Sequence, residues 1–118
     1  MSESFKEQIV QRIGRNFTDI MILRLIRMQP MWGYKIIKAM EARFGVQLGH
    51  GVLYPLLNSL EKTGFLKSRR EKHGGRVRKV YEITPKGIQL IDAYHRFLKE
   101  QIEMQDIKKG EENERKSI

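Results

Sequence analysis

Residues 49–87 read GHGVLYPLLNSLEKTGFLKSRREKHGGRVRKVYEITPKG, and this stretch decides the fold. Its first part has apolar residues at the three- and four-residue spacing of one helix face, at Val52, Leu53, Leu56, Leu57 and Leu60. Two strand-like segments, 65–71 and 77–84, follow on either side of the Gly74–Gly75 pair. The stretch therefore predicts a helix over 49–62 and then a β-hairpin.

Pro55 lies inside the helical part of this stretch, where proline lacks an amide proton and crowds the preceding turn. Two explanations are open. Either the helix begins close to Pro55 after a tight turn, or it begins at His50 and Pro55 lies near its first turn, where little is lost.

Upstream, the pattern predicts three further segments of interest. Residues 4–14 form a short amphipathic helix through Phe5, Ile9, Val10 and Ile13, which Gly14 ends. Residues 17–28 form a second helix that is apolar on most sides, with Thr18 or Asp19 as its cap and a turn at Gln29–Met31 enforced by Pro30. Residues 33–44 form an amphipathic helix that Gly45 closes, with its apolar face at Ile36, Ile37, Met40 and Phe44.

Downstream, Thr84-Pro85-Lys86-Gly87 supplies an N-cap and a proline at the first helical position, so a last helix is predicted over 85–105. It carries two adjacent apolar stripes. One contains Ile88, Ile91, His95, Leu98 and Ile102, and the other contains Leu90, Tyr94, Phe97 and Met104. A helix with such broad apolar coverage needs two neighbours, and the second is most simply the same helix of another subunit. The alternative is that both stripes are buried against the core of their own subunit. Residues 106–118 are almost entirely polar, and we expect a disordered tail.

Composition limits the function classes. The 118 residues include 23 Lys plus Arg against 14 Asp plus Glu, a formal net charge of +9, which favours a polyanionic partner. The absence of cysteine excludes disulfides, thiolate nucleophiles and sulfur-ligated zinc. The N-terminal MSESFKEQIV lacks the apolar core of a secretory signal, and no run is long enough to span a bilayer. We expect a cytoplasmic protein that does not bind membranes.

The helices over 17–28, 33–44 and 49–62, followed by a basic hairpin, form the winged helix-turn-helix arrangement, in which the third of these helices enters the major groove of DNA. The fold class is therefore mostly α with a small β-hairpin (α+β), with a winged helix-turn-helix domain over 1–84 and a dimerisation helix over 85–105. Cations gather in the hairpin, where they displace the counterions of a phosphate backbone. The expected wing residues are Arg69, Arg70, Lys72, His73, Gly74, Gly75, Arg76 and Arg78.

Three motifs occur in order along the chain: Trp32-Gly33-Tyr34-Lys35-Ile36-Ile37, the run from Gly51 through Leu53-Tyr54-Pro55-Leu56-Leu57 to Leu60-Glu61-Lys62-Thr63-Gly64, and Tyr81-Glu82-Ile83-Thr84-Pro85-Lys86-Gly87. Together they resemble the PadR family of transcriptional regulators over about residues 17–98. The resemblance implies a homodimeric regulator of transcription, a repressor, that acts on double-stranded DNA. It also allows for a small-molecule effector of unknown identity. Gly49 and Val52 depart from the family's hydroxyl-bearing positions, which leaves the operator sequence open.

The exposed side of the third helix is expected to meet DNA, through His50, Gly51, Val52, Tyr54 and Asn58. A carboxamide bonds adenine in a bidentate way, so Asn58 is the candidate base reader. Tyr54 either contacts phosphate or sugar, or is a half-buried core aromatic. A clamp on the DNA backbone is expected from the helix over 33–44, through Tyr34, Lys35 and Lys38. Trp32 is interpreted as filling the core or covering a turn, with contact to an aromatic ligand as the less favoured alternative.

Dimerisation is expected through the last helix, at Ile88, Ile91, Tyr94, His95, Leu98 and Ile102. His50, His73 and His95 fall in three different elements without carboxylates at ligand spacing, so we expect no metal and no cofactor. No nucleophile-and-base set can be assembled, and the protein is predicted not to be an enzyme. Two alternatives to a specific regulator remain: a winged-helix module that binds RNA or protein, and an architectural protein that binds DNA nonspecifically.

Overall fold

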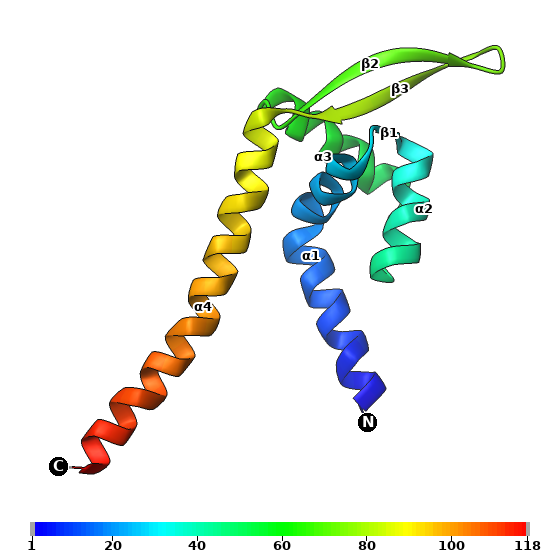
Figure 1. Ribbon diagram of the computed structural model, residues 1–118. Coiled ribbons are helices and arrows are strands. Elements are labelled where there is room, and N and C mark those ends of the chain that lie inside the picture. The colour runs from blue at the N-terminus through cyan, green and yellow to red at the C-terminus, as the bar shows by residue number, and fades with distance from the viewer. Residues whose placement is uncertain (1, 118) are drawn as a thin grey trace.

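The computed structural model describes the backbone of residues 2–117 and the side chains of residues 5, 7, 8 and 17–104. Over these residues the chain forms four helices and a three-stranded antiparallel sheet of order β1-β3-β2 (Figure 1). The elements are α1 (Ser2–Met28), β1 (Met31–Trp32), α2 (Gly33–Phe44), α3 (His50–Lys62), β2 (Leu66–His73), β3 (Arg76–Ile83) and α4 (Pro85–Ser117). The predicted α+β class is confirmed.

The two helices predicted over 4–14 and 17–28 are one element, α1, with a kink at Phe17. Gly14 was expected to end the first helix, and this prediction is wrong, because the non-helical backbone occurs at Phe17 with φ −128° and ψ 19°. Glycine accepts α geometry at a cost of only about 1 kcal/mol, so a neighbouring helix can continue through it. Phe17 packs edge-on against Tyr94 with ring centres 5.9 Å apart, which ties the kink to α4. The side chains of Ile9, Val10 and Ile13 lie outside the described residues.

The sheet contains a strand that the sequence analysis did not predict. Met31 and Trp32 form β1 and pair with Tyr81 and Val80 of β3, where a turn and a helix start were expected. Two residues are too few to show an alternating pattern, and β1 exists only because β3 offers it an edge.

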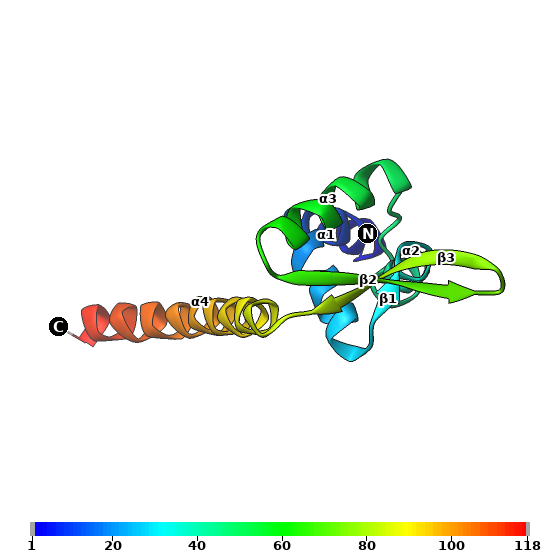
Figure 2. The same ribbon diagram turned by 90° about the horizontal axis from the view of Figure 1, so that it is seen from above.

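The hairpin turn is the one predicted from Gly74 and Gly75. Their φ angles of +54° and +79° are both left-handed, as a two-residue type I′ turn requires. The register pairs His73 with Arg76 beside the turn and Leu66 with Ile83 at the base. Seen from above, the hairpin projects past α2 while α4 extends in the opposite direction (Figure 2).

The hydrophobic core lies between α1, α2, α3 and the base of the sheet. Its fully buried side chains include Ile22, Leu23, Ile36, Met40, Leu53, Leu57, Leu66 and Tyr81. The predicted inward faces of α2 and α3 are thereby confirmed at Ile36, Met40, Leu53, Leu57 and Leu60. Gly45 has φ +66° and closes α2 as expected.

The structure decides between the two explanations of Pro55. α3 begins at His50, with Gly49 in extended geometry at its N-cap, so Pro55 is the sixth helical residue. Its missing amide would have bonded the carbonyl of Gly51, which lies in the exposed first turn. A lost bond at that exposed carbonyl is tolerated because water can take the amide's place.

α4 begins as the sequence predicts and ends later than predicted. The Gly87 amide donates to Thr84 Oγ1 at 3.1 Å, and Pro85 occupies the first helical position. The helix then runs to Ser117, whereas a boundary at 105 and disorder over 106–118 were expected. The expectation weighed only the poor apolar content of the tail. Its Lys, Glu and Arg are good helix formers, and extending an existing helix avoids the cost of nucleation. Ile118 lies outside the described residues.

Gly87 is required by packing, and its replacement tests the junction of hairpin and α4. A Cβ atom there would overlap the carbonyl oxygen of Phe65 and lie 2.7 Å from Ile83 Cγ1. We expect Gly87→Ala to lower the free energy of unfolding by about 1–3 kcal/mol, because backbone must move to admit the methyl group. Urea unfolding measures this. Gly51→Ala is the matched control, since nothing lies within 4 Å of its Cβ position and alanine favours a helix. Equal stability of Gly87→Ala and wild type would contradict this account.

Candidate nucleic-acid interface

The outer face of α3 carries the five residues predicted to meet DNA. His50, Gly51, Val52, Tyr54 and Asn58 are all exposed, and Leu53 and Leu57 on the opposite face are fully buried. This separation follows from the helical spacing, which places residues 50, 54 and 58 on one surface. Direct contact of these residues with DNA stays a prediction.

Tyr54 is partly exposed, and its contact with phosphate or sugar stays a prediction. Its side chain is 42% exposed, and its ring stacks on His50 with centres 5.7 Å apart. The hydroxyl end of the ring lies against Gly33, where a Cβ atom would lie 2.5 Å from the Tyr54 hydroxyl oxygen. Gly33 thus permits α2 and α3 to approach, and Tyr54 links the start of α2 to the exposed face of α3.

On one face of the hairpin, two carboxylates engage Lys67, Arg69 and His73. Arg69 Nε donates to Glu71 Oε1 at 2.6 Å, and Arg69 also pairs with Glu82. Lys67 lies 3.7 Å from Glu82, and His73 Nε2 lies 3.1 Å from Glu71 Oε2. Hydrogen bonds from Arg69 and then His73 lower the pKa of the Glu71 carboxyl below its usual value. Arg69 and His73, both expected to contact DNA, are therefore engaged within the hairpin.

The opposite face of the hairpin is fastened to the end of α3. The Ser68 hydroxyl donates to the Glu61 carboxylate, and Lys79 Nζ lies 3.1 Å from Glu61 Oε1. These bonds from Ser68 and Lys79 lower the pKa of Glu61, and the bond to Glu61 raises the pKa of Lys79. Burial raises the pKa of the neighbouring Tyr81 phenol. The Glu61 contacts therefore fix the orientation of the hairpin relative to α3.

The remaining hairpin cations are unpaired. Arg70, Lys72, Arg76 and Arg78 form no ion pair with any side chain that the structure describes. Arg70 and Lys72 share a face with Lys79 and Val77, and Arg76 and Arg78 share the other face with Glu71 and His73. Both faces near the tip therefore carry cations available to an anionic partner.

The predicted clamp residues lie on the exposed side of α2. Tyr34, Lys35 and Lys38 are exposed, and Lys38 Nζ lies 5.5 Å from the centre of the Tyr34 ring. Trp32, immediately before them, is half-buried, and the Arg78 guanidinium lies 3.7 Å from its ring centre. Trp32 belongs to the edge strand β1 and is not part of the hydrophobic core.

The residues predicted for dimerisation do not share one environment. Ile91 is buried in the subunit's own core, so its assignment to a dimer interface is wrong. Ile88 and Tyr94 are half-buried, whereas His95, Leu98 and Ile102 are exposed. The buried and half-buried residues lie in the first turns of α4, and the exposed ones lie further along the helix. The reason is that α4 diverges from α1 and leaves the core after its first turns (Figure 1). Phe97 and Met104 are exposed beside Leu98 and Ile102.

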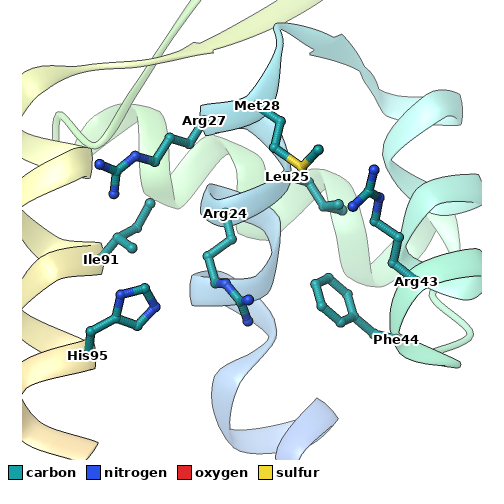
Figure 3. A pocket seen from close by; sticks show the side chains of 8 residues that line it. All are labelled: Arg24, Leu25, Arg27, Met28, Arg43, Phe44, Ile91 and His95. Carbon is teal, nitrogen blue, oxygen red and sulfur yellow. The ribbon is translucent and has the colours of Figure 1, made fainter. Parts of the chain in front are cut away.

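A cavity of about 400 Å³ lies between α1, the end of α2 and α4 (Figure 3). Leu25, Met28, Phe44 and Ile91 supply its apolar lining. Its polar lining comes from the guanidinium groups of Arg24, Arg27 and Arg43 and the imidazole of His95, with Arg27 paired to Asp92 at 3.2 Å. The sequence analysis missed these arginines, although Arg24 and Arg27 stand three residues apart on one helix. The cavity has chemistry suited to a small anionic effector, and the existence of an effector stays a prediction.

The described residues contain no group of three His, Asp or Glu side chains able to hold a metal ion. Within the same residues, no helix has the length and apolar character needed to cross a membrane.

Comparison with known proteins identifies the family. Residues 22–93 match the model of the transcriptional regulator PadR-like family, which is more than half of the chain. The chain belongs to the PadR-like family of transcriptional regulators. The predicted resemblance is confirmed, and the family is one of regulators and not of enzymes.

Individual relatives agree with this assignment. A PadR family transcriptional regulator from Eggerthella lenta superposes with a TM-score of 0.68 at 25% identity, over 87% of this chain and 93% of that one. Bacillus subtilis PadR, solved in complex with operator DNA, superposes with a TM-score of 0.61 at 28% identity, over 65% of this chain and 44% of that one. The transcriptional regulator Rv3488 of Mycobacterium tuberculosis is 39% identical over 59 residues, 50% of this chain and 55% of that protein. The PadR-like chain thus spans about half the length of this curated relative.

Proposed function

We propose that this PadR-like regulator binds double-stranded DNA sequence-specifically, with α3 in the major groove and the hairpin along the adjacent backbone. The observation that carries the proposal is the placement of unpaired cations beside an exposed helix face. Arg70, Lys72, Arg76 and Arg78 extend from the hairpin, which Glu61 fastens to the end of α3. A helix face fits the major groove, and cations that track phosphates supply the affinity that is independent of sequence. The operator complex of Bacillus subtilis PadR supports the same partner.

The active form we propose is a homodimer. Phe97, Leu98, Ile102 and Met104 form an exposed apolar surface in the middle of α4. A second hollow of about 340 Å³, lined by Leu90, Ala93, Tyr94 and Phe97, continues this surface toward the body of the subunit. Apolar surface of this extent on a helix that leaves its own core is typical of a subunit interface.

A two-fold axis through α4 would present two copies of α3 to one side of the duplex. Recognition helices in such dimers bind half-sites about 34–36 Å apart or a multiple of this distance, so we infer an inverted-repeat operator. A dimer bound across a promoter blocks access to it, and we propose repression as the mode of regulation. Footprinting of the DNA that flanks the protein's own gene tests the operator: an inverted repeat should be protected, and a uniform pattern of protection would contradict it.

The two alternative functions are separated by the specificity ratio. A regulator should prefer its operator over random duplex by about 10³-fold or more at physiological salt. An architectural protein would bind both duplexes equally. A module for RNA or protein would also show no preference between the duplexes, and would bind its RNA or protein target more tightly than either of them.

Asn58 is the residue we propose to read a base. Its side chain is exposed on the face of α3 that also carries His50 and Tyr54. Asn58→Ala should reduce discrimination at one base pair by about 1–3 kcal/mol, since a bidentate carboxamide–adenine contact is lost. Competition binding against operators with single substitutions measures this. Ser59→Ala, the exposed neighbour on the helix, is the control and should keep the wild-type preferences. If Asn58→Ala lowered the affinity for operator and random DNA equally, Asn58 would contact the DNA backbone and not a base.

A further inference from the structure

Four side chains from three elements form a continuous row of cations and aromatic rings. The Arg78 guanidinium carbon lies 3.7 Å from the centre of the Trp32 ring. The Trp32 and Tyr34 rings follow with centres 5.4 Å apart and a tilt of 31°, and Lys38 Nζ lies 5.5 Å beyond the Tyr34 ring centre. Each cation is within the range of about 6 Å at which a ring attracts it. The row connects the hairpin to α2 through β1.

The backbone fixes Trp32 in this position from two sides. Trp32 pairs with Val80 in the sheet, and Arg78 is two residues from Val80 on the same face of β3. Trp32 and Arg78 are therefore diagonal cross-strand neighbours, close enough for long side chains to touch. Trp32 is also the residue directly before α2. Any movement of the hairpin relative to α2 would separate the guanidinium from the indole.

The stack leaves the donors of Arg78 free. The register places Arg78 opposite Glu71, but the Glu71 carboxylate binds Arg69 and His73. Arg78 forms no ion pair with any described side chain. A guanidinium stacked by its face on a ring keeps its five N–H donors in its own plane, directed away from the ring. Such a group remains able to bind a phosphate in a bidentate way.

We propose that Trp32 is a positioning residue for DNA binding: it holds Arg78 in a fixed orientation and, through Tyr34, at a fixed offset from Lys38. The inference rests on the DNA-binding function proposed above. The row orders the Arg78 side chain before the complex forms, which reduces the entropy that binding would otherwise cost. The hairpin and α2 then present two cations of constant spacing to the DNA backbone. Trp32 acts through Arg78 and needs no contact with DNA of its own.

A double-mutant cycle tests this coupling. Trp32→Leu keeps an apolar side chain but removes the ring, and should weaken binding to all duplexes about two- to fivefold. Arg78→Gln should weaken binding by a smaller factor in the Trp32→Leu background than in wild type, because the arginine is no longer held there. Trp32→Phe should recover part of the loss, since it restores a ring. The control pair is Trp32→Leu with Arg70→Gln, whose factors should multiply, as Arg70 lies on the other face of the hairpin.

Fluorescence supplies a readout that a merely structural role would not move. Trp32 is the single tryptophan of the chain, so its emission reports on this stack alone. Arg78→Gln should change the emission of the free protein, and Arg70→Gln should not. Thermal unfolding checks that Trp32→Leu is folded, and Trp32→Phe carries the test if it is not. Independent factors for Trp32 and Arg78 would overturn the inference while wild-type DNA binding stands. A wild type that binds no duplex would overturn the proposed function as well.

Discussion

Replacing Leu98 and Ile102 together by aspartate is expected to convert the dimer to a monomer and to reduce operator affinity by about 10²- to 10⁴-fold. In the single subunit Leu98 and Ile102 are 43% and 66% exposed, so the substitutions do not disturb the hydrophobic core of the subunit. In the proposed dimer the same positions would place carboxylates without partners between two apolar surfaces, which is strongly unfavourable. Affinity falls because a dimer holds its second α3 at high effective concentration near the second half-site, and a monomer does not.

Sedimentation velocity at micromolar concentration measures the change, together with operator binding on the same samples. Arg96→Asp is the control, because it alters the net charge by the same two units on the opposite side of α4 and should leave the mass unchanged. Helical circular dichroism should be the same in all three proteins. A wild-type chain that sediments as a monomer would rule out the dimer.

Local signals in the sequence predicted much of the interface. The spacing of Leu53, Leu57 and Leu60 assigns the inner face of α3 and therefore the outer face as well. The Gly74–Gly75 pair predicts the hairpin turn, because the two positive φ angles suit glycine. The cap at Thr84 likewise depends on four consecutive residues. Each of these features is set within about eight consecutive residues.

The features that the sequence did not predict depend on residues distant in the chain. β1 is defined by its pairing with β3, about fifty residues later, and two residues carry no pattern of their own. The cavity between α1, α2 and α4 appears only once three elements are placed together. The burial of Ile91 and the exposure of Leu98 depend on the angle at which α4 leaves α1. The periodicity of apolar residues predicts which face of a helix is apolar. It does not predict how far along the helix that face is covered by neighbouring elements.

Charge in the hairpin shows the same limit. A count of charged residues suggests that all cations of the wing are equivalent. By this count, Glu71 is the one acidic residue among them before Val80. The strand register adds Glu82 directly opposite Lys67, where it binds both Lys67 and Arg69. Pairing across strands therefore divides the cations into a set engaged by carboxylates and a set available to DNA. That division can be measured.

Replacing Arg76 and Arg78 together by alanine is expected to flatten the slope of log K against log salt by about 2 and to weaken binding to every duplex about 10- to 100-fold at 0.1 M salt. Each arginine that neutralises one phosphate releases condensed counterions, and the affinity gained in this way does not depend on the DNA sequence. Filter binding or fluorescence anisotropy over a series of salt concentrations gives the slope. Preference for operator over random DNA should remain, because in the proposed complex the base contacts come from α3.

The matched control is Lys67→Ala with Arg69→Ala, which removes the same charge from the same hairpin. These cations are already paired with Glu82 and Glu71, at 3.7 Å for Lys67 and 2.6 Å for Arg69 Nε, so few counterions should depend on them. The slope should therefore change less than in the Arg76 and Arg78 variant. Equal changes would mean that the ion pairs open in the complex and that all hairpin cations contact phosphate. An unchanged slope after loss of Arg76 and Arg78 would show that the hairpin does not track the backbone, and the proposed docking of the wing would fail.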